Sequence, residues 1–424
     1  MGATVGGDVS VLFNALQVVA STGNVAAVST PGLASRVRAT QAQLQRKDPT
    51  IATKAGIVHV PVLSTDLTLR PLDALLELSL GTALRTPRLL APFTRWWSVL
   101  RYLGLFDWDP STNRLRLDSG AIADVGANQR RVISEEIGIG FAVLAAKQWV
   151  QARVPGVGPV SVMDVDRALF NGWVPGMQRA GKRQPDYLLR YEDPQQSGVS
   201  VYELLESKGT VSRSTVTRQL GRAATQLGGL LIGGRPITGL AVSTVSAADG
   251  VEIHAIDPVE PPVEWRRDQL AVESWRNVER YYDLQAPRID VSPAPFFATA
   301  ANVELGSLSQ FAGLRTVARQ WYPRFGSSTD GASDADAHRD YGGRTFVGEE
   351  FVAEVPGVAD SRVRVFHGVD TNVAAALRDT DAEQVSGAQR EFAKSRPLNS
   401  APTETQPAAA AVSDVGAILE ISLT

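Results

Sequence analysis

The chain has 424 residues, of which 44% are hydrophobic and 21% charged, and its formal net charge is −3. This length predicts two or three domains in a soluble globular protein. The absence of cysteine excludes disulfides and thiolate metal sites, and the slightly acidic balance argues against a protein that coats nucleic acid without specificity. No apolar run is long enough to span a membrane and no targeting signal is recognisable, so we expect a cytoplasmic protein without a membrane partner.

Residues 1–125 are predicted to form a mainly helical N-terminal domain that binds DNA or a protein partner. Residues 57–63 have the pattern of a strand, whereas apolar residues recur with helical spacing at 11–20, 33–44, 72–80 and 87–105. The last of these helices, followed by alternation at 113–117, resembles the final helix and wing of a winged-helix domain. A plain helical bundle, or a protein-interaction surface built on Trp96 and Trp97, is the alternative.

The next predicted helix covers residues 131–153. Its apolar stripe includes Ile137, and Glu136 falls on this stripe while Glu135 lies beside it. A carboxylate near a helix N-terminus is also favoured by the helix dipole, which gives Glu136 a purely structural explanation. Residues 160–165 follow as a predicted strand.

The pattern of a β-hairpin comes next, with apolar strands at 187–191 and 199–208 around a polar turn that contains Pro and Gly. Residues equidistant from such a turn face each other, so we expect Asp186 to lie beside Glu206. Because side chains alternate between the two faces of a strand, Lys208 joins Glu206 on one face. The hairpin therefore brings two carboxylates and one ammonium group together.

These three residues also stand out in the sequence itself. Asp186 belongs to the only Pro-Asp dipeptide, and Glu206 and Lys208 form the only acid-x-Lys pattern in a chain with six lysines. Buried charges are too costly unless they pair or bind a metal. Two carboxylates are ligands of the kind that Mg²⁺ uses, and an adjacent lysine can position or deprotonate a water or neutralise charge on a phosphate. A solvated hairpin with a surface ion pair is the alternative.

The same residues resemble the motif of the PD-(D/E)xK nuclease superfamily, and the resemblance extends from about residue 130 to residue 261. It implies an α/β fold with a restriction-endonuclease-like αβββαβ core in a nuclease-like domain at 126–262. It also implies Mg²⁺, with Mn²⁺ as a substitute, bound by Asp186 and Glu206. By the same resemblance, the backbone carbonyl of Ser207 completes the coordination and Glu136 is a further ligand.

Residues 212–230 have the pattern of a helix, and strands are predicted at 237–245 and 251–256. Some branches of the family place a glutamine on this helix near the metal or the scissile phosphate, so the resemblance implies a site role for Gln219. The tyrosine usual four residues later is replaced by Ala223. Five basic residues around the site are candidates for nucleic-acid contacts, although an ordinary solvated face is equally compatible: Lys182, Arg183, Arg213, Arg218 and Arg222.

Residues 263–424 are predicted to form a mixed α/β C-terminal region. A Gly-, Ser- and Asp-rich stretch at 326–343 has the composition of a mobile loop, and an Ala-, Pro- and Thr-rich stretch at 399–412 that of a linker. The remaining pattern predicts helices at 263–284, 300–322 and 369–379 and strands at 345–366 and 417–423.

Together these features predict a multidomain protein whose centre is a Mg²⁺-dependent endonuclease acting on DNA, in bacterial or phage restriction or antiviral defence. RNA is the alternative substrate. A non-catalytic DNA-binding or assembly protein on the same fold is the alternative function. A homodimer, or a partner protein that regulates cleavage, is compatible with the sequence.

Overall fold

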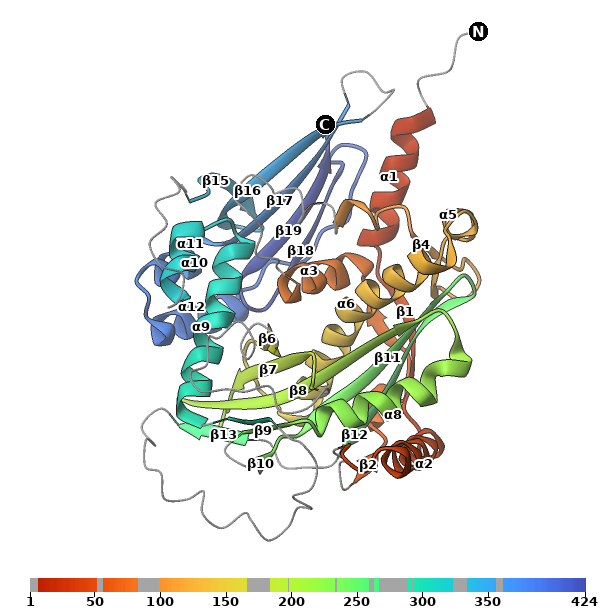
Figure 1. Cartoon of the computed structure of the whole chain (residues 1–424). Helices are drawn as coiled ribbons and strands as arrows, with labels where there is room; N and C mark the ends of the chain where they lie inside the picture. The colour runs from red at the N-terminus through yellow and green to blue at the C-terminus, as the bar shows by residue number, and fades with distance from the viewer. Residues whose placement is uncertain are drawn as a thin grey trace.

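The computed structural model of the chain describes residues 7–51, 56–82, 96, 99–165, 184–196, 198–232, 235–258, 263–266, 289–291, 293–322, 334–355 and 361–424. It shows a mixed α/β protein with a large, curled mixed sheet and a separate antiparallel sheet near the C-terminus (Figure 1). Helices α3 (Pro71–Gly81) and α6 (Ala127–Arg153) share one apolar core with both sheets. In these ranges no helix is both long and apolar enough to cross a membrane.

The central sheet has the strand order β3-β1-β12-β11-β8-β7-β6, with β13 paired to β8 and β2 paired to β12. Its strands are β1 (Gly23–Val28), β2 (Ile57–Val58), β3 (Leu67–Leu69), β6 (Ser161–Asp164), β7 (Tyr187–Glu192), β8 (Val199–Thr210), β11 (Gly239–Ala247), β12 (Gly250–Pro258) and β13 (Val263–Arg266). Strands β6, β7 and β8 form an antiparallel meander, and β11 runs parallel to β8.

Between β8 and β11 the chain forms a single 3-10 turn, η2 (Arg213–Thr215), and helix α8 (Val216–Leu227). Successive side chains of β8 enter two different cores, because Leu205 packs with α6 and Leu204 packs with α8. The two helices therefore cover opposite faces of the sheet (Figure 1). The elements predicted between 131 and 256 are present in the predicted order, but the predicted helix at 212–230 ends at Leu227, and two short strands that were not predicted, at 230–232 and 235–236, follow it.

The prediction of a mainly helical N-terminal region is wrong. Helices α1 (Gly7–Ala20), α2 (Pro31–Lys47) and α3 form as predicted. However, β1 pairs in parallel with β12 and antiparallel with β3, so the N-terminal segment completes the central sheet. The sequence of β1, Gly-Asn-Val-Ala-Ala-Val, has weak strand propensity of its own, and pairing with β12 decides its conformation. The segment predicted as a strand at 57–63 divides into β2 and a 3-10 turn, η1 (Pro61–Leu63).

The winged-helix prediction falls partly outside the described residues. A short hairpin of β4 (Phe106–Trp108) and β5 (Leu115–Leu117) is present, followed by α5 (Ser119–Ala123). Most of the predicted helix at 87–105, including Trp97, lies outside the described residues. Trp96 is buried and stacks on Phe351 with ring centroids 4.0 Å apart, so its side chain belongs to the core rather than to a binding surface.

The C-terminal sheet has the order β15-β16-β17-β19-β18, and four helices accompany it. The strands are β15 (Ala337–Tyr341), β16 (Arg344–Glu354), β17 (Arg362–Asp370), β18 (Ala408–Val412) and β19 (Ala417–Leu423), and the helices are α9 (Pro293–Phe311), α10 (Arg315–Trp321), α11 (Thr371–Arg378) and α12 (Ala382–Lys394). A further small sheet joins β9 (Leu230–Ile232) with β10 (Arg235–Pro236) and β14 (Ile289–Val291).

Three C-terminal predictions need correction. Residues 337–341 of the predicted mobile loop form edge strand β15, whose alternate side chains are exposed and therefore polar. Residues 408–412 of the predicted linker form β18, whose small alanine side chains are buried in the core that includes α3. Residues 263–266 begin a predicted helix but pair with β8 as a strand, and the rest of that helix, 267–288, lies outside the described residues.

Candidate active site

The predicted register of the hairpin is confirmed. Tyr187 pairs with Leu205, which places Asp186 beside Glu206 at the end of the sheet where β7 begins. The backbone N–H of Asp186 donates to Glu206 Oε2 at 2.9 Å, and the N–H of Ser207 donates to Asp186 Oδ2 at 3.2 Å. Each carboxylate thus holds the strand that carries the other, which fixes both acids in one place.

Lys208 completes the cluster. Its Nζ lies 3.7 Å from Asp186 Oδ2 and forms an ion pair with Glu206 Oε1. The Glu206 side chain is fully buried, whereas those of Asp186 and Lys208 are 36% and 25% exposed. Glu206 therefore forms the buried inner part of the cluster, and Asp186 and Lys208 form its solvent-accessible side.

The charges of this cluster perturb one another. Burial raises the pKa of Glu206 well above its usual range, and the nearby Asp186 carboxylate raises it further, although Lys208 opposes both effects. Burial by itself lowers the pKa of Lys208, but Glu206 and Asp186 outweigh it, so the pKa is raised. The two carboxylates therefore favour the charged form of Lys208.

A cavity of about 550 Å³ opens onto the cluster. Asp186 and Lys208 line it together with Gln219 and Arg222 from α8. Two further carboxylates that the sequence prediction did not include, Glu135 of α6 and Asp164 at the end of β6, also line it. The cavity therefore collects acidic groups from three separate elements.

Glu136, the predicted third ligand, is not among the residues that line the cavity. Its carboxylate accepts hydrogen bonds from Tyr102 and from Arg101, the latter at 3.1 Å. Its neighbour Glu135 is exposed and lines the cavity instead. A shift of one residue along a helix turns a side chain by about 100°, and the apolar stripe alone does not resolve which of two adjacent acids faces the site.

A close contact between α6 and β8 brings Glu135 to this edge. A Cβ atom on Gly209 would lie 1.9 Å from the carbonyl oxygen of Ser134 and 2.6 Å from the Cα of Glu135. Only glycine therefore allows the helix backbone to rest on the strand directly after Lys208. This contact depends on how α6 packs on β8, so the spacing of Asp186, Glu206 and Lys208 in the sequence could not predict it.

The two glutamines of α8 anchor the two strands that carry the cluster. The Gln219 side chain donates to the Gly209 carbonyl at 3.1 Å and accepts from Ser243 Oγ at 2.8 Å. The Gln226 side chain donates to the Gln184 carbonyl at 3.1 Å, just before Asp186. Gln219 lines the cavity, and because both ends of its amide are engaged, it holds β8 in position beside the site.

Three of the five basic candidates lie in the described part of the chain. Arg222 lines the cavity and Arg218 is exposed on the preceding turn of α8. Arg213 forms ion pairs with Asp249 at 2.6 Å and with Glu252 at 2.8 Å, so its charge is already balanced. Lys182 and Arg183 lie outside the described residues.

The donors at the cluster suit a hard divalent cation that keeps water ligands. In the part of the chain that the structure describes, no group of three or more His, Cys, Asp or Glu side chains is arranged to hold a metal ion by itself. Asp186 and Glu206 are two adjacent carboxylates whose mutual repulsion contributes to the raised pKa of Glu206. A cation bound between them would relieve that repulsion, and Mg²⁺ commonly uses one or two carboxylates with waters and substrate phosphate.

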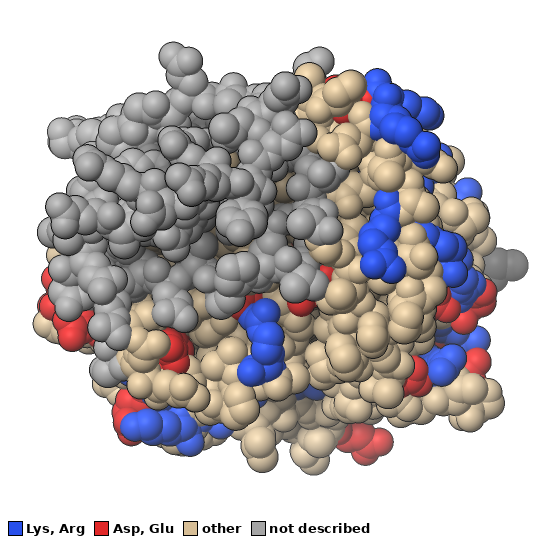
Figure 2. Space-filling view, turned by 90° about the horizontal axis from the view of Figure 1, so that it is seen from below, with Lys and Arg blue, Asp and Glu red and all other residues tan. Residues whose placement is uncertain are grey.

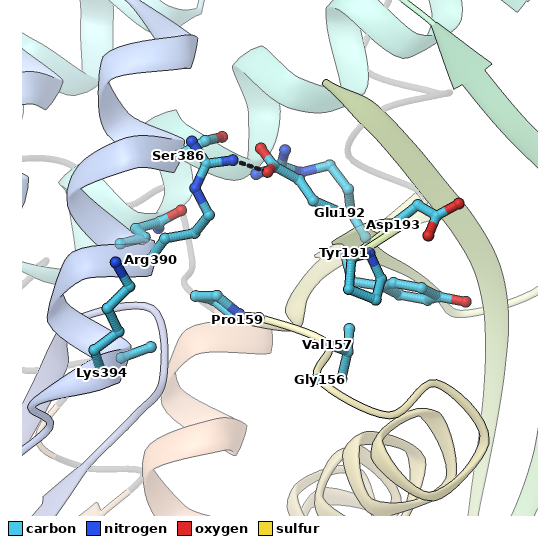
Figure 3. Close-up of a pocket in the computed structure, with 14 residues that line it drawn as sticks. Gly156, Val157, Pro159, Tyr191, Glu192, Asp193, Ser386, Arg390 and Lys394 are labelled. Atoms are coloured by element: carbon cyan, nitrogen blue, oxygen red, sulfur yellow. Dashed lines mark hydrogen bonds and ion pairs between the residues drawn. The ribbon is translucent and has the colours of Figure 1, made fainter. Parts of the chain in front are cut away.

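A second cavity, of about 440 Å³, lies at the opposite end of β7, between the hairpin turn and α12 (Figure 3). Its charged residues are mostly neutralised by one another or by neighbours. Arg390 forms an ion pair with Glu192, and Arg190 donates to Glu304 at 2.6 Å and 2.9 Å. Its two acids, Glu192 and Asp193, are consecutive residues, and Asp193 accepts hydrogen bonds from Gln195 and Gln196 in the hairpin turn.

Comparison with known proteins provides no relative, since no family model, no curated protein and no solved structure matches the chain.

Proposed function

We propose that this chain is a metal-dependent nuclease that hydrolyses DNA phosphodiester bonds, built on the αβββαβ core of the PD-(D/E)xK superfamily. The observation that supports it best is the order α6-β6-β7-β8-α8-β11. In it an antiparallel meander is followed by a helix and a strand parallel to β8. The Asp186, Glu206 and Lys208 cluster lies at one end of this meander and faces a cavity.

In this proposal Asp186 and Glu206 hold Mg²⁺ or Mn²⁺, and the carbonyl of Ser207 supplies a further oxygen. Glu135 or Asp164 would take the part that the resemblance implied for Glu136, because these two acids line the cavity. When bound, the cation supplies charge stabilisation at the attacked phosphate and lowers the pKa of a water.

The position of Lys208 supports its role. Its Nζ lies beside both carboxylates and the side chain lines the cavity, where it acts as a hydrogen-bond donor and positive charge. It orients the attacking water and stabilises the negative charge that develops as the new P–O bond forms and the bond to the leaving oxygen breaks. The wider setting that we propose is bacterial or phage restriction or defence.

The test is cleavage of plasmid DNA, linear DNA and a matched RNA strand with Mg²⁺ or Mn²⁺. We expect metal-dependent cutting of DNA by the wild type and none by Asp186→Ala or Lys208→Ala. Glu192→Gln, at the other end of β7, is the matched control and should cut normally. Cutting that persists in both site variants, or a wild type that stays inert with either metal, would contradict the proposal. Preferential cutting of RNA would retain the site and change the substrate.

A further inference from the structure

Helices α2 and α8 pack against each other and carry basic residues but no acidic ones. The chain as a whole has 45 acidic and 42 basic residues, so these two helices concentrate positive charge in a protein whose net charge is −3. We call this surface the α2–α8 basic surface. It consists of Arg36, Arg38, Arg46, Lys47, Arg218 and Arg222.

All six side chains are exposed, and none of them forms an ion pair with another residue that the structure describes. Arg213, just before α8, differs because Asp249 and Glu252 balance its charge. The nearest acid along α2 is Asp48, which caps the end of the helix. Within the described ranges, therefore, no acidic side chain balances the charge that this surface presents to solvent.

Packing fixes the position of this surface relative to the cavity. The apolar faces of α2 and α8 enter one core, which turns their basic residues outward. The helices meet at Gly221, where a Cβ atom would lie 2.6 Å from Thr40 Cγ2. The next residue, Arg222, lines the cavity, and Thr40 lies one turn beyond Arg36. The surface thus begins at the cavity and continues onto α2.

Figure 2 shows this underside of the molecule. Lys and Arg side chains gather toward the right, on the side where α2 and α8 lie in Figure 1. No large exposed hydrophobic residue of the described chain lies on either helix, since those present are Val11, Val58, Val211, Val352 and Leu398. A helix that inserts into a lipid surface needs an exposed apolar face, so this composition favours a soluble polyanion over a membrane.

We propose that the α2–α8 basic surface binds the sugar–phosphate backbone of double-stranded DNA beside the cavity, an inference that rests on the proposed nuclease function. Arginine and lysine contacts to phosphate position a duplex without reading its sequence. Helix α2 is about 25 Å long, which matches about 7 base pairs of duplex. The N-terminal segment thereby extends the footprint beyond the residues at the cavity.

Binding can be separated from cleavage by working with Asp186→Ala in EDTA. We compare it with the same protein carrying Arg36→Gln, Arg38→Gln and Arg46→Gln on α2, and measure anisotropy of a labelled duplex of about 20 base pairs, which exceeds the span of α2. The control removes three exposed charges elsewhere, with Arg362→Gln, Arg378→Gln and Lys394→Gln. A fourth protein carries lysine at the three α2 positions.

We expect the α2 glutamine variant to bind at least about tenfold more weakly, with a slope of log K against log salt that is smaller by about 2 to 3, since each phosphate contact contributes about 0.9. The control and the lysine variant should bind as the parent does. Equal losses in the α2 variant and the control, unchanged binding in the α2 variant, or no salt-sensitive binding by the parent would each overturn the proposal.

Vesicles of phosphatidylserine and a polyglutamate peptide serve as competing polyanions. If the α2 variant no longer binds the vesicles or the peptide but still binds the duplex, the proposal is overturned in favour of a lipid or an acidic protein. The outcome is independent of cleavage. If the wild type binds DNA through α2 but never cuts it, the proposed nuclease function is contradicted. If the α2 glutamine variant of the otherwise wild-type protein binds and cuts DNA normally, only the proposed role of the basic surface is contradicted.

Discussion

The protein contains two clusters with the same charges, a lysine between two carboxylates, in opposite surroundings. In the first, Lys147 donates to Glu77 Oε1 at 2.7 Å and to Asp414 Oδ1 at 2.8 Å, and none of the three side chains is more than 12% exposed. In the second, Lys208 lies beside Glu206 and Asp186 at the edge of a cavity. The first cluster is closed and the second is open.

The closed cluster joins three distant segments. Glu77 comes from α3, Lys147 from α6 and Asp414 from the turn between β18 and β19, and Asp414 Oδ2 also accepts from the N–H of Val160 at 2.9 Å. Burial by itself lowers the pKa of Lys147, but both carboxylates outweigh it and the pKa is raised. The three side chains pair with one another away from solvent, which suits a structural role.

In the open cluster the two carboxylates are close to each other and only partly balanced by the lysine. Burial and the Asp186 charge raise the pKa of Glu206, but burial and the Asp414 charge also raise the pKa of Glu77, so a raised carboxyl pKa does not separate the two clusters. The comparison teaches that residue types do not distinguish a structural ion cluster from a site. Solvent access does, since Asp186 and Lys208 are far more exposed than the members of the closed cluster, and four experiments test this distinction.

Lys147→Met should have the largest effect. It leaves two buried carboxylates without their partner, and breaking a buried ion pair in this way costs about 3–5 kcal/mol. We expect a loss of that size in the free energy of unfolding, measured with denaturant, and normal cleavage by the fraction that stays folded. Arg378→Met, on an exposed helix end, should change stability by less than about 0.5 kcal/mol. Similar stabilities for the two variants would show that the closed cluster is not structural.

Lys208→Met should have the opposite profile. The loss of one positive charge at a site of transition-state charge costs about 10²–10³ in rate. We expect a loss of that size in single-turnover cleavage, with a smaller change in unfolding free energy than Lys147→Met, because Lys208 is 25% exposed and Glu206 can take up a proton. A Lys208→Met protein that unfolds as readily as Lys147→Met would remove the distinction between the clusters.

Glu135→Gln and Glu136→Gln separate two adjacent acids. Glu135 lines the cavity, so its loss should slow cleavage by about tenfold, as expected for an outer partner of a metal site. Glu136 accepts hydrogen bonds from Arg101 and Tyr102, so its loss should lower stability by about 1–3 kcal/mol and leave the cleavage rate unchanged. The reverse pattern, with the slower enzyme at position 136, would restore the prediction made from the helix stripe.

The smallest effect is a dependence of stability on pH in the presence of EDTA. The pKa of Glu206 is raised in the folded protein above an unfolded value of about 4.3, so its contribution to stability is present at acid pH and is lost as the pH rises through the folded pKa. The Tm of the wild type relative to Glu206→Gln should therefore fall as the pH rises above the unfolded pKa of about 4.3. Mg²⁺ should raise the Tm of the wild type alone at the higher pH values. Parallel curves for the two proteins would count against the raised pKa.

The sequence was sufficient for the central segment because its signals are local. Strand patterns on both sides of a Pro- and Gly-containing turn determine a hairpin register, and that register alone places Asp186 beside Glu206. The stripe of α8 likewise places Gln219 next to the core. These conclusions need no information about which elements meet in space.

The tertiary structure decided what depends on contacts between distant segments. Glu135 and Asp164 face the cavity because α6 rests on Gly209 and β6 joins the sheet beside β7. Strand β1 exists because β12 offers it a partner, and the alanines of β18 are a strand because a core covers them. Sequence patterns report a residue's own preference for helix or strand, whereas the neighbour it packs against is set by the fold as a whole. Glu135 and Asp164 at the cavity, and helix α2 beside α8, are neighbours of this kind.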